Sequence, residues 1–252
     1  MFRNMPAKSA LIYFVIATVT AVLSLAALIL VSINSKNQIS LAIEIIQLFN
    51  SLVALTGMIS CILIYKDLLL PKIVVQSLIC FVLGELYWVL HVYIRGYEQV
   101  GVFSISDISW IGFYLFLLTA CRNVFHPVID FKDKYRKINI VSLFAPIFII
   151  GINSVLYLTG DSLFYTIIYT VPTAFLSYCT LRLFLTSFKN KKLKGFGSYH
   201  IIIGLILLID NLTCLTWNLG FEYMAYIFKF CFALLLLPIT SAVYKGVRNC
   251  PL

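Results

Sequence analysis

The chain has 252 residues, of which 62% are hydrophobic and only 12% are charged. Soluble domains are typically about 45–50% apolar and about 25% charged, so this composition excludes an ordinary soluble domain and indicates an integral membrane protein. The net charge is +9. No basic run has the interleaved aromatic residues that stack on bases, so we expect contacts with anionic membrane lipids and no binding of nucleic acid.

Apolar runs long enough to cross a bilayer recur along the whole chain. Backbone groups in lipid must bond to one another, so such runs form helices, and we predict an all-α, polytopic membrane helix bundle that makes one domain, 1–252. The eight predicted transmembrane helices are 9–33, 41–65, 73–94, 106–121, 140–159, 162–187, 200–219 and 221–244.

The lysines and arginines support this number of spans. If the N-terminus is cytoplasmic, 16 of the 19 fall on the cytoplasmic side; Lys36 and Arg95 lie outside, and Lys229 lies within the last helix. The positive-inside rule therefore predicts a multi-pass protein of the cell membrane with both termini in the cytoplasm. The longest interior piece, 122–139, mixes charged and aromatic residues, and we expect part of it to form an interfacial helix.

Glu85, Asp210 and Lys229 fall deep inside predicted helices. Ionisable groups are costly in lipid, so each is a candidate functional residue. With a rise of about 1.5 Å per residue, all three lie about 12–13 Å from the outer ends of their helices. Asn50 falls at a similar level, and Trp88 follows Glu85 at helical spacing. A tight turn joins the last two helices, which makes Asp210 and Lys229 natural partners.

Two interpretations of these residues remain open. They could line a polar cavity in the outer leaflet that binds a small or lipidic ligand or an ion. They could instead be interhelical contacts that fix the packing of the bundle. Glu44 and Gln47 add polar groups beside Asn50 at steps of three, although Glu44 is close enough to the outer surface to reach headgroups or water.

The phrase SISDISW predicts the start of the fourth helix at the outer surface. Ser104 and Asp107 have the spacing of a capping box, and an acid in the first turn complements the helix dipole. Trp110 then falls where indole rings are enriched, at the membrane interface. These three residues therefore have a structural interpretation as an outer helix cap.

Signatures of catalysis and of metal binding are missing from the sequence. His91, His126 and His200 are far apart, and the chain contains no HExxH, GxSxG or P-loop pattern. The seven cysteines include no CxxC pair. We therefore expect no enzyme activity, no metal site and no cofactor.

Two short phrases in neighbouring helices carry a family resemblance. They are Gly84-Glu85-x-x-Trp88 and Ser104-x-x-Asp107-x-x-Trp110, and Phe113 and Tyr114 follow the second. Around these phrases the chain resembles the multi-span membrane region at the N-terminus of many bacterial GGDEF signalling proteins. Elsewhere the resemblance extends only to hydropathy and helix number.

The resemblance implies a sensory or signal-input membrane protein of bacteria. In that family an output domain follows the last helix, whereas this chain ends at Leu252, shortly after the last predicted helix. We therefore expect a stand-alone input module without cyclase activity that acts through a cytoplasmic signalling partner. The alternative is a small-solute or proton-coupled transporter or permease, against which the absence of an evident internal repeat argues.

Overall fold

The computed structural model describes residues 5–34, 38–96, 104–126, 136–160 and 162–249, and over these residues the protein is all-α. Eight helical segments within the described ranges are long and apolar enough to cross a membrane. The elements are α1 (Met5–Asn34), α2 (Ile39–Ile64), α3 (Leu69–Arg95), α4 (Ile105–Ala120) continued by the π-helical turn η2 (Cys121–Phe125), α5 (Arg136–Ser142), α6 (Phe144–Leu158), α7 (Leu163–Ser187), the 3-10 turn η5 (Lys194–Phe196), α8 (Gly197–Asn218) and α9 (Glu222–Asn249).

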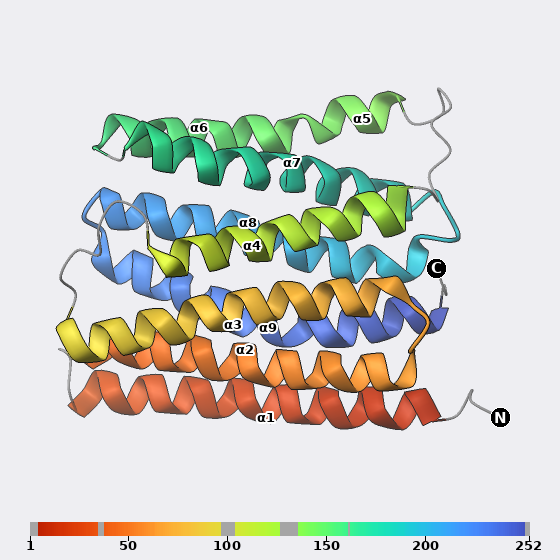
Figure 1. Cartoon of the computed structure of the whole chain (residues 1–252), viewed down its shortest axis with the longest axis horizontal. Coiled ribbons are helices and arrows are strands. Elements are labelled where there is room, and N and C mark those ends of the chain that lie inside the picture. Colours follow the sequence, from red (N-terminus) through yellow and green to blue (C-terminus); the bar gives the residue numbers. More distant parts are fainter. Residues whose placement is uncertain (1–4, 35–37, 97–103, 127–135, 161, 250–252) are drawn as a thin grey trace.

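The eight spans run alternately in opposite directions along one axis, which brings the start of α1 and the end of α9 to the same end of the bundle (Figure 1). α9 lies in the interior and packs against α1, α2, α8 and η5. α4 packs against both α3 and α7. α9 and α4 therefore lie between one edge of the bundle, formed by α1, and the other edge, formed by α5 and α6 (Figure 1).

The outside of the bundle is strongly apolar. On α1 alone, Leu11, Ile12 and Phe14 are exposed by 63%, 59% and 59%. Soluble proteins rarely expose continuous apolar surface of this extent, whereas lipid tails accept it. The inward face of α1 is held by Tyr13, whose hydroxyl donates to the Leu237 carbonyl at 2.7 Å and whose ring fills the space where a Cβ on Gly57 would lie.

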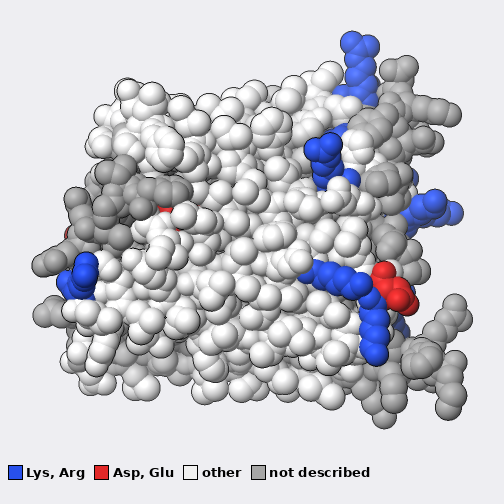
Figure 2. Space-filling view, viewed as in Figure 1, with Lys and Arg blue, Asp and Glu red and all other residues white. Residues whose placement is uncertain are grey.

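Basic side chains gather at the end of the bundle that holds both termini, and the middle of the visible face carries almost no charge (Figure 2). We call this end the basic end. The described lysines and arginines that follow α2, begin α3 or lie around η5 belong to it; they include Lys66, Lys72, Lys189, Lys192 and Lys194. Arg95 ends α3 at the opposite end. The asymmetry is the one on which the prediction of cytoplasmic termini depends.

The fourth and fifth predicted spans have different bounds in the structure. The fourth does not stop at 121, because α4 continues through η2, so that the span is Ile105–Phe125. The interior piece expected over 122–139 is therefore shorter, since η2 reaches Phe125 and α5 begins at Arg136. The interfacial helix predicted within it stays a prediction, because residues 127–135 lie outside the described part. The predicted helix 140–159 is divided between α5 and α6.

Pro146 explains the division of the fifth span. It lacks a backbone N–H, and its ring opposes the carbonyl four residues earlier, which belongs to Ser142, the last residue of α5. The last helix shows the opposite error, since α9 continues beyond the predicted end at 244 to Asn249. Gly246 lies inside α9 because the Phe196 ring packs directly against it. A Cβ at Gly246 would lie 2.2 Å from that ring.

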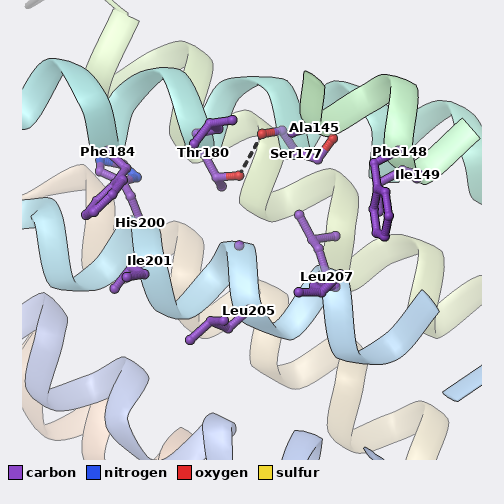
Figure 3. Close-up of a pocket in the computed structure, with 13 residues that line it drawn as sticks. Ala145, Phe148, Ile149, Ser177, Thr180, Phe184, His200, Ile201, Leu205 and Leu207 are labelled. Carbon is purple, nitrogen blue, oxygen red and sulfur yellow. Dashed lines mark hydrogen bonds between the residues drawn. The ribbon is translucent and has the colours of Figure 1, made fainter. Parts of the chain in front are cut away.

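A pocket of about 270 Å³ lies between α6, α7 and α8. Phe148 and Ile149 stand at one end of it and His200 at the other (Figure 3). The hydroxyls of Ser177 and Thr180 reach its wall, but each donates to a carbonyl of its own helix. The lining therefore suits hydrocarbon, and this pocket is not the polar cavity that the sequence led us to expect.

Candidate functional site

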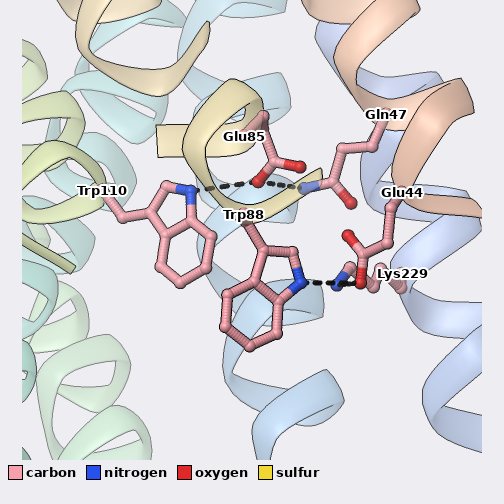
Figure 4. Close-up of polar contacts among 6 residues, drawn as sticks. All are labelled: Glu44, Gln47, Glu85, Trp88, Trp110 and Lys229. Carbon is pink, nitrogen blue, oxygen red and sulfur yellow. Dashed lines mark hydrogen bonds and ion pairs between the residues drawn. The ribbon is translucent and has the colours of Figure 1, made fainter. Parts of the chain in front are cut away.

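Polar side chains from four helices meet inside the half of the bundle opposite the basic end. α2 and α3 each supply two of them at a spacing of three residues, which places each pair on one helical face. α4 and α9 supply one each. We call this group the acidic cluster; its members are Glu44, Gln47, Glu85, Trp88, Trp110 and Lys229 (Figure 4).

Glu85 lies in the middle of the acidic cluster and is only 1% exposed. One carboxylate oxygen, Oε1, accepts hydrogen bonds from Nε2 of Gln47 at 3.1 Å and from the indole Nε1 of Trp110 at 3.0 Å. The donors come from α2 and α4, on either side of α3. Glu85 therefore faces its neighbouring helices and not the lipid.

Glu44 is the carboxylate beside Lys229. The Lys229 ammonium lies 2.5 Å from Oε1 of Glu44, and the same oxygen accepts from the indole Nε1 of Trp88 at 3.1 Å. Glu44 is buried, whereas the Lys229 side chain is 26% exposed. The contact joins α2, α3 and α9 through one oxygen atom. It also keeps the cost of an ionised acid in this apolar bundle low, because the opposite charge is adjacent.

Gly84 makes the contact between Trp110 and Glu85 geometrically available. A Cβ at Gly84 would lie 2.8 Å from Nε1 and 2.9 Å from Cδ1 of Trp110, distances that side-chain carbons essentially never adopt. The indole of Trp110 therefore passes directly over the backbone of α3 to reach the adjacent carboxylate. Glycine is required here for close approach rather than for its backbone freedom.

Further polar contacts extend from the acidic cluster across the bundle. Asn50 accepts from Ser24 Oγ of α1 at 3.0 Å and donates to the Ala233 carbonyl of α9 at 3.1 Å. Asp210 of α8 accepts a short hydrogen bond from the Tyr114 hydroxyl of α4. These contacts add α1 and α8 to the helices already joined.

The Asn153 amide of α6 donates to Asn211 of α8 at 2.8 Å, and the hydroxyls of Tyr165 and Tyr169 on α7 donate to Asp107 at 3.2 and 3.1 Å. We call the whole set of contacts, with the acidic cluster at its centre, the polar layer. It joins all eight of the spans in the described part of the chain. Individual hydrogen bonds between membrane helices contribute about 0.6 kcal/mol on average, so the layer acts mainly through the number of its members.

Ser104 and Asp107 form the beginning of α4. The Asp107 amide donates to Ser104 Oγ at 3.4 Å, and the Ser104 amide donates to Oδ2 of Asp107 at 2.7 Å, which together make a capping box. The other oxygen of Asp107 receives the two tyrosine hydroxyls of α7. Asp107 therefore caps α4 and also fixes that helix against α7.

We expect Ser104→Ala to lower the free energy of unfolding by about 0.5–2 kcal/mol, because the first turn of α4 loses its side-chain acceptor. Ser109→Ala is the matched control, since Ser109 Oγ donates only to the Ile105 carbonyl of its own helix. Its effect should stay within about 0.5 kcal/mol. Unfolding of both variants in detergent micelles measures the difference, and equal losses would show that the cap contributes nothing.

The structure distributes the predicted site residues over several contacts. Glu85, Trp88 and Lys229 belong to the acidic cluster, whereas Asn50 and Asp210 have separate partners within the polar layer. Lys229 has a different carboxylate neighbour from the expected Asp210: its ion pair is with Glu44. The sequence favours Asp210 over Glu44 as the partner, because Glu44 lies nearer the outer surface.

Trp110 also has a second role. The sequence predicts Trp110 at the interface as part of the outer cap. In the structure its indole N–H donates to the buried Glu85. Only the phrase Gly84-Glu85 indicates this in the sequence, since a small residue beside an acid leaves room for a large donor. Across the described residues no group of three or more His, Cys, Asp or Glu side chains is arranged to hold a metal ion.

Comparisons with known proteins give no relative for this chain. No family model matches it, and neither a curated protein nor a solved structure matches it. The resemblance to the membrane region of GGDEF signalling proteins therefore stays a prediction from the phrases around Glu85 and Asp107. The fold and composition establish a polytopic membrane protein with eight candidate spans in its described residues.

Proposed function

We propose that the protein is a sensory or signal-input protein of the bacterial cell membrane. It binds a small or lipidic ligand in the polar layer and acts without catalysis. The basic end faces the cytoplasm, in keeping with the positive-inside rule, and meets a signalling partner there. The observation that carries this proposal is the position of α4, which with η2 contacts neighbouring helices both in the polar layer and at the basic end.

At the end near Ser104, α4 reaches three neighbouring helices through side chains one turn apart. Asp107 accepts from α7, Trp110 donates to α3 and Tyr114 donates to α8. A ligand that displaces any of these contacts changes how α4 is held. Because a ligand shifts an equilibrium only through its different affinity for two states, such contacts are where that difference has to arise.

At the basic end, α4 continues into η2, a π-helical turn. The Phe125 ring lies 5.1 Å from the ring of Phe196 in η5 and 4.6 Å from that of His200 in α8. π-helical turns are rare and are often found at functional sites. A continuous helical segment with partners at both ends connects the polar layer with the basic end.

Hydrogen–deuterium exchange of Trp110→Phe tests this connection. The variant loses the N–H that donates to Glu85 and keeps a ring over Gly84. We expect amide exchange to increase several-fold in η2 and η5 as well as around residue 110. Trp217→Phe is the control, because Trp217 is half exposed, its ring packs on Tyr226 and no hydrogen bond among the described residues joins it to the acidic cluster. Changes confined to the neighbourhood of Trp110 would favour a purely structural polar layer.

A proton-coupled transporter is the second candidate, and one observation favours it. Lys229 forms an ion pair with Glu44 and also acts electrostatically on Glu85 and Asp210, so three carboxyl groups share one ammonium group. Intramembrane acids of this kind form proton relays in transporters. A transporter would admit protons into proteoliposomes under an imposed potential, as reported by an internal pH dye, and Asp210→Asn would abolish that entry. A sensory protein would admit none.

A further inference from the structure

Three neighbouring oxygen atoms in the acidic cluster have no hydrogen-bond partner among the described residues. They are Oε2 of Glu44, Oε1 of Gln47 and Oε2 of Glu85. The three side chains are 2%, 5% and 1% exposed. In Figure 4, Oε1 of Gln47 and Oε2 of Glu44 point toward each other, and Oε2 of Glu85 points toward the Gln47 amide that lies between the two carboxyl groups. The acidic cluster therefore brings together three buried acceptors and no donor for them.

Turning the Gln47 amide over does not supply the missing donor. In Figure 4 the amide lies between the carboxyl groups of Glu85 and Glu44, and its NH2 end donates to Glu85. Either orientation leaves one carboxyl group facing the amide oxygen. Burying a polar atom without a hydrogen-bond partner costs free energy. Burying a carboxylate that faces another oxygen costs more, because the two oxygens repel each other. These oxygens therefore call for a further donor or a positive charge beside them.

The charges of the surrounding helices point the same way. The titratable groups that face the acidic cluster from the packed elements are Glu44 of α2, Glu85 and His91 of α3, Tyr114 of α4, Asp210 of α8 and Lys229 of α9. Only Lys229 among them carries a permanent positive charge at neutral pH. Its ammonium lies on Oε1 of Glu44, and none of the three oxygens has a hydrogen bond from it.

We infer that Oε2 of Glu44, Oε1 of Gln47 and Oε2 of Glu85 form a binding site for a single monovalent positive charge, either a proton or an alkali cation. As a proton, the charge adds to one carboxylate oxygen, and the new O–H donates to Gln47 or to the other carboxylate. As an alkali cation, it takes the three oxygens as ligands, which are of the hard type that such ions prefer. The inference names the ligand class of the polar layer and so rests on the function proposed above.

Thermal unfolding of the full chain in lipid nanodiscs separates the two forms of the charge. The first series varies pH between about 5 and 8 in choline chloride. If the folded protein holds a proton that the unfolded chain releases, the midpoint falls as the pH rises. The second series replaces choline with Na⁺ or K⁺ at the upper pH and constant ionic strength. If an alkali cation binds, the midpoint rises by a few degrees for each tenfold increase in its concentration.

Two variants and one control decide whether the response belongs to these oxygens. Glu85→Gln should abolish the response, and Gln47→Leu should weaken the apparent affinity at least about tenfold, which is roughly the loss of one good polar contact. Glu222→Gln is the control, because Glu222 is an exposed acid in the first turn of α9. It should leave the response unchanged.

The absence of a response in both series, or a full response in Glu85→Gln, would overturn the inference. If Glu85→Gln does not fold, the affinity of Gln47→Leu decides the outcome, since that variant changes no charge. The exchange experiment with Trp110→Phe is done in a single buffer and does not depend on a bound cation. Its failure therefore counts against the proposed function, and failure of the unfolding series counts against the cation site alone.

Discussion

Replacing Lys229 by methionine is expected to lower the free energy of unfolding by about 3 kcal/mol, the lower end of the range for breaking a buried ion pair. The lower end applies because the lysine is 26% exposed while its partner Glu44 is buried. Methionine keeps the length of the side chain but leaves Glu44 with only the Trp88 N–H as a donor. The carboxyl groups of the acidic cluster then lose the ammonium group that offsets their charge.

Unfolding of Lys229→Met in bicelles or micelles measures this loss. Lys245→Met is the matched control, because Lys245 is an exposed lysine of the same helix near the basic end. Its replacement should change the free energy of unfolding by less than about 0.5 kcal/mol. If the two variants behaved alike, the contact between Lys229 and Glu44 would have no energetic weight.

Gly84→Ala is expected to destabilise the protein by about 1–3 kcal/mol, the usual cost of adding a methyl group to a filled space. The new Cβ would lie 2.8 Å from Nε1 of Trp110, so the indole has to move away and Glu85 loses a donor while it stays buried. The tryptophan emission should shift together with the loss of stability, because the indole N–H exchanges its carboxylate partner for a different environment.

Gly151→Ala provides the comparison for Gly84. Gly151 lies within α6, where a Cβ would have no atom within 4 Å. Alanine is favoured over glycine in a helix interior by about 0.5–1 kcal/mol, so this variant should be neutral or more stable. An equal gain in stability from Gly84→Ala would mean that Trp110 does not pass over Gly84.

The sequence predicts the spans of this protein well, because hydropathy reports directly which residues can replace water by lipid. It fails where a single residue changes the local backbone or packing. Pro146 divides the fifth span, although the apolar run continues through it. Gly246 continues a helix that glycine would ordinarily end, because only glycine leaves room there for the Phe196 ring.

The sequence predicts how deep the candidate site residues lie in the bundle, but it does not predict which residues they contact. Counting residues along each helix places Glu85, Asp210 and Lys229 at one level, because the rise per residue is nearly constant. The rotation of each helix and the identity of its neighbours depend on packing, which one sequence does not contain. Asp210 therefore takes Tyr114 as its donor, and Lys229 lies against Glu44.

The phrases that carry the family resemblance acquire a common physical meaning in the structure. Gly84 leaves room for Trp110, Glu85 accepts from it, and Trp88 donates to Glu44. Asp107 starts α4 and holds it against α7. These residues therefore fix how α2, α3, α4 and α7 pack at one level, which is a property that a signal-input protein and a stable transporter would both need.

The measurement that tests the central claim most directly is a double-mutant cycle between Glu44 and Lys229. The claim is that the acids and the lysine of the polar layer close on one another inside the bundle. The cycle compares the unfolding free energies of the parent chain, Glu44→Gln, Lys229→Met and the double variant. We expect the double variant to recover about 1–3 kcal/mol relative to the sum of the single losses, the coupling typical of residues in contact. Losses that add to within about 0.5 kcal/mol would contradict the account.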